Sequence, residues 1–424
     1  MTAPAGWTLL TADRLLDGSG AGPLDDAAVL IEGETIRAIG RRSEVRPPDG
    51  AEAASHEYGD ATILPGLVDG HTHLVGIGDG TRGDDVAVQG DDLLLIRATV
   101  NARAMLHSGV TTIRENGSKG RIAFSVREAI RHGITDGPRM VVAGRAVTIT
   151  GGHLHYFGGE ADGADGVRHA VRQLVKEGAD FIKIMASGGS TRSSHPNLPA
   201  FTPGELRAIV DEAQRHERLT AAHAVPSTAI EDCLDAGLDM IIHCSMTEAT
   251  GAYVYRPDLA DRMAEAGVWV NPTMHDIRAW LWYYRDEAAA ARRLDATGVA
   301  SLDELRRLYD DKLDAVRRLR AAGVRLIAGS DSAWGRSPAG RGWLEIDALT
   351  DAGLSPAEAI AAGTTGSAAA IGVGDVAGRL EPGRPADLLV VAGDPLADLA
   401  VLGDPVDVFQ DGHRVIRSDR GASR

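Results

Sequence analysis

Cysteine is scarce in this chain of 424 residues, which has only Cys233 and Cys244. Two thiols are too few for a disulfide framework or for a cysteine zinc site. Any bound metal ion must therefore be held by histidine and carboxylate side chains. We expect both cysteines to be buried and reduced.

The chain also lacks an excess of basic residues and lacks long apolar runs. The 44 Lys and Arg residues are outnumbered by 60 Asp and Glu residues, which gives a net charge of −16. No concentrated basic segment is available to neutralise phosphates, so we expect no nucleic-acid partner and no anionic membrane partner. No segment approaches the roughly 20 apolar residues of a membrane helix, and the first 16 residues do not resemble a secretion signal. A cytoplasmic location is expected.

The length exceeds what one hydrophobic core normally holds, so a large and a small domain are expected. Residues 7–64 alternate short apolar segments with turn residues, which predicts an antiparallel β unit. Strand-like patterns return from Gly378 to the C-terminus. We predict that residues 1–64 and 376–424 together form one small β-sandwich domain.

Between these ends, strand-like runs alternate with helix-like stretches. Eight alternating units over about 300 residues favour a closed (β/α)8 TIM barrel over residues 65–375, within the α/β class. The number of strands alone does not exclude an open sheet. One expected outer helix covers residues 301–323, where apolar positions recur every three or four residues before a glycine. The strand-like runs are residues 66–74, 109–116, 139–150, 180–189, 219–225, 239–245, 268–274 and 325–331.

His71 and His73 lie two residues apart at the end of the first of these runs. Residues i and i+2 of a strand face the same way, so both imidazoles could bind one metal ion. The pair alone is weak evidence. Because a TIM barrel carries its functional residues at the carboxyl ends of its strands, the polar residues at the other ends strengthen the hypothesis. The candidate metal ligands are His71, His73, Lys183, His223, His243 and Asp331.

Each of these residues also has a structural explanation. A single strand histidine is more often a hydrogen-bonded core residue, and Lys183 could pair with Glu115 at the end of the second strand. Burying four imidazoles, an ammonium and a carboxylate together is costly, however, unless cations offset the cost. Two divalent ions would do so.

Several further motifs can be read along the chain: PGLVDGHTHL, GVTTIREN, TGGH, GEADG, GADFIKIMASGG, AAHA, IIHC, AGSD and PADLLVVAGDP. Together they resemble those of the amidohydrolase superfamily, in the branch of imidazolonepropionases and prolidase-type (Xaa-Pro) dipeptidases. The resemblance implies a metal-dependent barrel beside a β-sandwich that both chain ends build. It also implies that His71, His73 and Asp331 hold one ion, and that His223 and His243 hold a second.

In such a site Lys183 would bridge both ions as a carbamate formed with carbon dioxide. An ammonium cannot bind a cation, but a lysine that is kept neutral by burial and nearby positive charge can take up CO2 and become anionic. Zinc is the first expectation for the ions, and the ligand types also admit manganese, iron or cobalt.

The expected mechanism starts from a hydroxide on the metal centre, because coordination lowers the pKa of the bound water to about 7. Asp331 would deprotonate the water and then pass the proton to the leaving nitrogen. The other ion, or a neighbouring histidine such as His243, would polarise the scissile carbonyl.

Substrate contacts are expected from loops beside the metal site. A second HxH pair, His153 and His155, lies in the Gly-rich stretch TGGHLHYFGGEADG, and we interpret this stretch as a substrate loop with His153 and Tyr156 as contacts. His275 follows the seventh strand, and Arg192 could bind a substrate carboxylate bidentately. The alternatives are a surface loop, a solvated histidine and a surface arginine.

Aromatic residues make up only 4% of the chain, yet four of them cluster at Trp280, Trp282, Tyr283 and Tyr284. This cluster could wall a pocket, form an oligomer contact or pack a helix on the barrel. A homo-oligomer that acts on a small-molecule substrate is expected.

The leading function is metal-dependent hydrolysis of an amide-type C–N bond in an N-acyl amino acid or an Xaa-Pro-like dipeptide. One alternative is hydrolysis of a cyclic amide or imidazolone, or deamination. Lys183 weighs against it, because relatives with those activities often use one metal and lack the bridging lysine. An alternative of another class is an inactive binding or assembly protein, which would usually have lost metal ligands.

Overall fold

The computed structural model describes residues 6–286 and 302–415. The predicted small domain extends beyond these residues at both chain ends, and the first residue of the expected 301–323 helix also lies outside them. None of the helices within the described ranges is both long and apolar enough to cross a membrane.

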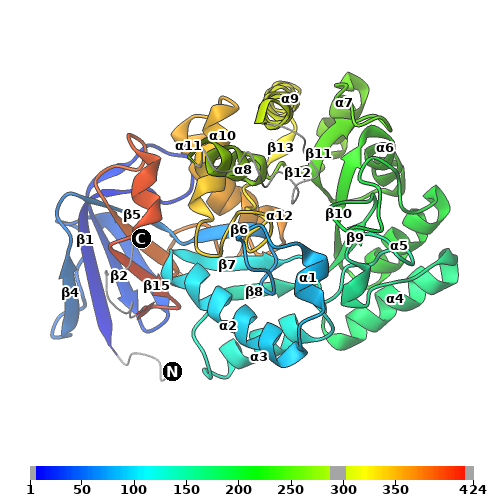
Figure 1. The fold of residues 1–424 in the computed structure, drawn as a ribbon. Coiled ribbons are helices and arrows are strands. Elements are labelled where there is room, and N and C mark those ends of the chain that lie inside the picture. The colour runs from blue at the N-terminus through cyan, green and yellow to red at the C-terminus, as the bar shows by residue number, and fades with distance from the viewer. Residues whose placement is uncertain (1–5, 287–301, 416–424) are drawn as a thin grey trace.

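An eight-stranded sheet takes its strands from both ends of the chain (Figure 1). Its order is β16-β15-β14-β5-β1-β2-β3, with β4 beside β1. The two ends join where β14 runs antiparallel to β5, with Val390 opposite Ile63. The division into two domains at residues 64 and 376 stays a prediction. The strands are β1 Trp7–Leu15, β2 Leu24–Glu32, β3 Thr35–Arg41, β4 Ala53–Glu57, β5 Ala61–Pro65, β14 Leu388–Ala392, β15 Asp407–Gln410 and β16 His413–Arg414.

Eight parallel strands form the second β structure. They make a three-stranded sheet, β6-β7-β8, and a five-stranded sheet, β13-β12-β11-β10-β9. Parallel bridges join the two sheets at both edges, from Val147 to Ile184 and from Thr72 to Ser332, so the ring of strands closes. The predicted α/β class with a (β/α)8 barrel is confirmed. The strands are β6 Leu67–Thr72, β7 Val110–Glu115, β8 Arg139–Val142, β9 Phe181–Met185, β10 Leu219–Pro226, β11 Met240–Thr247, β12 Trp269–Asn271 and β13 Arg325–Leu326.

Helices follow the barrel strands and lie outside them (Figure 1). Local sequence sets several of their ends: α5 and α11 begin at capping boxes, and α4, α6 and α7 end at glycines in the left-handed region. The α-helices are α1 Gly83–Ala87, α2 Asp91–His107, α3 Ile122–Arg131, α4 Gly163–Glu177, α5 Pro203–Arg215, α6 Ser227–Ala236, α7 Pro257–Ala266, α8 Met274–Asp286, α9 Leu302–Ala321, α10 Trp343–Asp351, α11 Pro356–Ala361 and α12 Ser367–Ala370. Shorter helical turns are η1 His155–Phe157, η3 Ala362–Gly366 and η4 Leu399–Gly403.

The aromatic cluster on α8 contributes to helix packing. Trp280 and Tyr284 are buried against Leu305 of α9, and Trp282 is partly exposed. Of the three interpretations of these residues, packing of a helix is the one that these contacts support. Cys233 and Cys244 are both free and buried, as predicted.

Candidate metal centre

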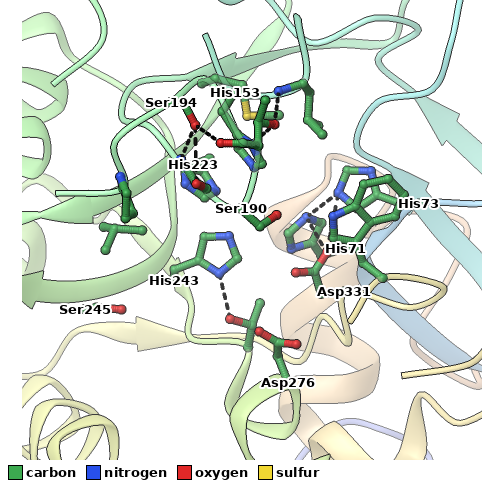
Figure 2. Close-up of a pocket in the computed structure, with 18 of the residues that line it drawn as sticks. His71, His73, His153, Ser190, Ser194, His223, His243, Ser245, Asp276 and Asp331 are labelled. Carbon is green, nitrogen blue, oxygen red and sulfur yellow. Dashed lines mark hydrogen bonds and ion pairs between the residues drawn. The ribbon is translucent and has the colours of Figure 1, made fainter. Parts of the chain in front are cut away.

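A cavity of about 530 Å³ lies at the carboxyl ends of the barrel strands. The six predicted metal ligands come from β6 and the residue that follows it, from β9, β10 and β11, and from the segment after β13, and all of them line this cavity. Figure 2 shows His71, His73, Asp331, His223 and His243 around one opening. Residues that are up to 260 positions apart in the sequence are thus brought to one place.

His71, His73 and Asp331 form the tightest group in this cavity. Their potential ligand atoms all lie within 4.8 Å of one another. The two Nε2 atoms are 3.2 Å apart, and each is 3.4 Å from Oδ1 of Asp331. Among the residues that the structure describes, this is the group of His, Cys, Asp and Glu side chains with the geometry to hold a metal ion.

The hydrogen bonds on the far side of both rings fix their tautomers. His71 Nδ1 lies 3.1 Å from Oδ1 of Asn271, and His73 Nδ1 lies 3.0 Å from the Gly117 carbonyl. The Asn271 amide is itself oriented, because its Nδ2 donates to the Gly329 carbonyl at 3.0 Å. Both partners are acceptors, so the protons sit on Nδ1 and the Nε2 lone pairs face each other.

Asp331 completes this electron-rich group. Its Oδ1 is buried and has no hydrogen-bond partner in the structure. Two imidazole lone pairs and a carboxylate oxygen that converge without a proton between them need a cation to stabilise them. The residues present therefore fit a divalent metal ion.

His223 and His243 lie next to this group, with ring centroids 4.5 Å apart. His223 Nε2 donates to the Gly188 carbonyl at 2.8 Å, which leaves the Nδ1 lone pair available. His243 Nδ1 lies 2.8 Å from Thr273 Oγ1, whose own proton goes to the Pro272 carbonyl. His243 Nδ1 must then carry the proton, so Nε2 is free to bind a cation.

The electrostatics keep these rings unprotonated. Burial and the nearby Lys183 charge lower the pKa of His73 and of His223 to about 3. Burial also holds the pKa of His71 and of His243 well below the usual range. Neutral imidazoles are the form that binds metal ions.

Lys183 and Asp331 are both buried and face the same cavity. Burial lowers the pKa of the Lys183 ammonium, and burial raises the pKa of the Asp331 carboxyl. The Lys183 shift favours the neutral amine, whereas a cation bound at the site would favour the ionised carboxylate of Asp331. A neutral amine at Lys183 is the form that can react with carbon dioxide.

Asp69 links β6 to the segment after β13 behind the ligands. Its Oδ1 accepts the backbone N–H of His71 at 3.1 Å and that of Ser330 at 2.9 Å, and its Oδ2 accepts the Ser330 hydroxyl at 2.5 Å. His71 and the neighbour of Asp331 are thus held by one carboxylate.

The backbone at the site is strained. His243, Thr273 and Asp331 have φ values of 70°, 51° and 54°, in the left-handed region that non-glycine residues seldom adopt. Such a conformation costs on the order of 1–3 kcal/mol for each residue and is typical of functional sites.

Of the four predicted substrate contacts, two line the cavity and two do not. His153 is buried and lines the cavity, with Nδ1 2.8 Å from Thr191 Oγ1. Arg192 also lines it, but its exposed guanidinium is paired with both oxygens of Asp85 at 2.9 Å.

Tyr156 and His275 are not among the described residues that line the cavity. The Tyr156 hydroxyl lies 3.5 Å from Thr191 Oγ1. The His275 ring packs against Trp282, and its Nδ1 faces Arg278. His275 therefore packs along its own helix, α8, and not into the cavity.

Among the cavity residues that the sequence did not predict are Asp276 on α8, Lys312 on α9 and Trp334 after β13. For Lys312, the sequence contained one indication that the side chain is buried. It occupies the same face of α9 as the buried residues Leu305 and Leu319, where an apolar side chain is expected. Asp276 and Trp334 gave none beyond their closeness in sequence to His275 and Asp331.

Comparisons with known proteins agree with this geometry. The model of the Amidohydrolase family matches residues 62–415. Ochratoxinase from Aspergillus niger is 29% identical over 94% of this chain and 84% of its own length. Imidazolonepropionase from Ralstonia nicotianae is 26% identical over 96% of this chain and 97% of its own. A crystal structure of a Xaa-Pro dipeptidase with bound methionine superposes with a TM-score of 0.83, at 28% identity, over 97% of this chain and 100% of that chain.

The family match spans the whole barrel and the two strands of the large sheet at which the chain ends join. It confirms the resemblance that the motifs indicated, and it includes every residue of the candidate metal centre. The relatives are named for hydrolytic activities on C–N bonds. This chain belongs to the amidohydrolase family and is a hydrolase that acts on carbon–nitrogen bonds.

Proposed function

We propose that this protein cleaves the amide bond of an N-acyl amino acid or an Xaa-Pro-like dipeptide at a centre of two divalent metal ions. The observation that carries the proposal is the convergence of unprotonated nitrogen atoms and an unpartnered carboxylate oxygen beside the buried Lys183. The Xaa-Pro dipeptidase structure and the ochratoxinase sequence support this substrate class.

His71, His73 and Asp331 would hold one ion, and His223 and His243 the second. Lys183, as a carbamate, would lie between them. When bound, such ions supply Lewis acidity and lower the pKa of bound water to about 7. Zinc is proposed first, with manganese, iron or cobalt as alternatives.

Proton transfer would be carried out by a residue of the chain, Asp331. Asp331 carries a buried oxygen without a hydrogen-bond partner, so it can take a proton from the attacking water and deliver it to the leaving nitrogen. Its strained backbone keeps this carboxylate aimed into the cavity.

His153 can steady the carbonyl oxygen during attack. Thr191 Oγ1 accepts the backbone N–H of Leu154 at 3.1 Å, so its hydroxyl can donate to His153 Nδ1 at 2.8 Å. His153 Nε2 would then carry a proton and act as a donor toward developing negative charge.

The test is an assay of the purified, metal-loaded protein. A panel of N-acyl amino acids, Xaa-Pro dipeptides, cyclic amides and an imidazolone would be supplied, and elemental analysis would count the ions for each chain. We expect turnover of linear amides and two ions. Turnover of the cyclic substrates alone, with one ion, would contradict the proposal and favour the activity for which imidazolonepropionase is named.

The proposal of another class, an inactive binding or assembly protein, makes the opposite prediction in the same assay. A protein that is replete with metal and inert toward the whole panel would support it. The complete set of candidate ligands weighs against this outcome.

A further inference from the structure

Lys312 places a buried positive charge on the wall of the cavity. Its side chain reaches from α9, and only 4% of the residue is exposed. Nζ donates to the His243 carbonyl at 2.5 Å and to Ser245 Oγ at 3.3 Å. No carboxylate of the described residues lies within 4.0 Å of this ammonium. A buried cation without a counter-ion is costly unless something else supplies the negative charge.

The other basic residues of the cavity have different surroundings. Arg192 is exposed and already paired with Asp85. Arg82 immediately precedes α1, the helix that carries Asp85. Lys183 lies among the candidate metal ligands. Among the basic residues of the cavity wall, Lys312 is therefore the buried cation that is available to bind a negatively charged group of a bound molecule.

The donors around Lys312 match a carboxylate. An ammonium has three donors, and two of them are used by the His243 carbonyl and Ser245 Oγ. Ser245 also lines the cavity, and its hydroxyl proton has no acceptor among the described residues. One N–H and one O–H, on atoms 3.3 Å apart, are thus available to the two oxygens of one acid group.

We propose that Lys312 and Ser245 bind the free carboxylate of the substrate, so that this enzyme prefers amides with an acid group over the same amides without one. The inference rests on the proposed function and narrows its substrate class. The sequence predicted that Arg192, in the loop after β9, binds the substrate carboxylate. The inference assigns this role to Lys312 on α9 instead.

A purely structural role for Lys312 is the competing explanation. The strand end that it contacts is strained, with φ values of 70° at His243, 50° at Cys244 and 51° at Met246. A lysine that only clamps this backbone would affect all substrates equally. A lysine that binds an acid group would affect acids alone, so the ratio between the two kinds of substrate separates the explanations.

The experiment compares methionyl-proline with its C-terminal methylamide, and N-acetyl-methionine with its methylamide. Lys312→Met should raise KM for the acids by about 10-fold to 100-fold, as expected when a hydrogen-bonded charge is lost. KM for the methylamides should change less than about threefold, and Lys312→Arg should restore part of the preference. Equal losses on acid and methylamide would overturn the inference.

Two variants sharpen the result. Lys176→Met makes the same change on the exposed side of α4 and serves as the matched control. Asp276 lines the cavity near Lys312, whose charge lowers the pKa of this carboxyl against the larger rise caused by burial. Asp276→Asn removes a negative charge and should lower KM for the acids. A rise in KM as large as that of Lys312→Met would contradict the inference.

Calorimetry makes the test independent of turnover. Metal-loaded wild-type protein should bind N-acetyl-methionine more tightly than its methylamide, and Lys312→Met should lose this difference while its metal content and Tm match the wild type. Equal binding of the acid by both proteins would overturn the inference even if the protein hydrolyses neither probe. Loss of turnover with the binding preference intact would contradict the proposed function alone.

Discussion

At His71 and His73, the atom that faces the cavity is determined by the partner of the opposite ring nitrogen. Asn271 and the Gly117 carbonyl each accept a proton from Nδ1, so both Nε2 atoms present lone pairs. The sequence shows the two histidines but not these partners, which come from β12 and from the turn after β7. The residue pattern predicted candidate ligands, and the three-dimensional contacts define their protonation.

Asp331→Asn should reduce kcat by about 100-fold or more, within the usual range for a proton-transfer group. The amide is close in size to the carboxylate but cannot accept the proton of the attacking water. Steady-state kinetics on a linear amide would measure the effect, with Tm and metal content as controls for folding. An unchanged kcat would remove Asp331 from the proton transfer.

Lys183→Ala should lose bound metal and turnover together, because the proposed carbamate would be absent. Added bicarbonate with a short carboxylic acid should restore part of the activity, since a free carboxylate can occupy the space of the missing side chain. Elemental analysis and turnover would be measured in parallel, with Lys176→Ala as the control on an exposed helix surface. Full metal content and full turnover in Lys183→Ala would contradict the bridging role.

At the scale of elements, the eight expected barrel strands are present but several are shorter than the sequence runs. The run 325–331 forms a strand only at Arg325–Leu326, and the run 268–274 only at Trp269–Asn271. Both run into residues with positive φ, Thr273 and Asp331. The predicted strands extend through them, but the backbone turns there to direct side chains into the cavity, and β propensity does not encode that turn.

Helix α11 offers a prediction about stability and pH. Backbone N–H donation at Ser355, together with Arg320, lowers the pKa of Glu358 to about 2. A depressed pKa contributes stability that is complete above the unfolded value near 4.5 and is lost as the pH falls toward 2. Glu358→Gln should therefore reduce the free energy of unfolding at pH 7, by about 1 kcal/mol or less because the side chain is half exposed.

Urea denaturation from pH 7 downward would measure this difference, which should shrink below pH 4.5. Glu265→Gln on the exposed face of α7 is the control, because no capping contact involves this residue. A difference that stays constant or grows as the pH falls would show that the charge of Glu358 does not stabilise the cap.

At the scale of the whole molecule, the ring of strands closes where Thr72 pairs with Ser332. His73 and Asp331 lie next to this closure, so the ends of the first and last barrel strands share one candidate metal site. An ion held there would connect segments that are about 260 residues apart. The metal centre should consequently contribute to the stability of the barrel as well as to catalysis.

Removal of the metal ions should lower Tm and abolish turnover, and both should return when divalent metal is added back. A ligand that binds only the folded state stabilises it by about 4 kcal/mol when present at 1,000 times its Kd. Thermal unfolding with and without a chelator would measure the shift, and His71→Ala should show a much smaller one. Native protein whose Tm and turnover are both insensitive to chelation and to added metal would contradict the metal centre.

The sequence by itself determined the β/α alternation, the participation of both chain ends in a β unit and the six residues at the strand ends. These features follow from local periodicity, and a closed parallel barrel brings the carboxyl ends of its strands together. The tertiary structure alone decided which side chains meet beyond the strands. It paired Arg192 with Asp85, packed the His275 ring against Trp282 of the same helix and brought Lys312 of α9 to the cavity. Such contacts depend on how loops and helices pack in three dimensions, which residue spacing along the chain does not specify.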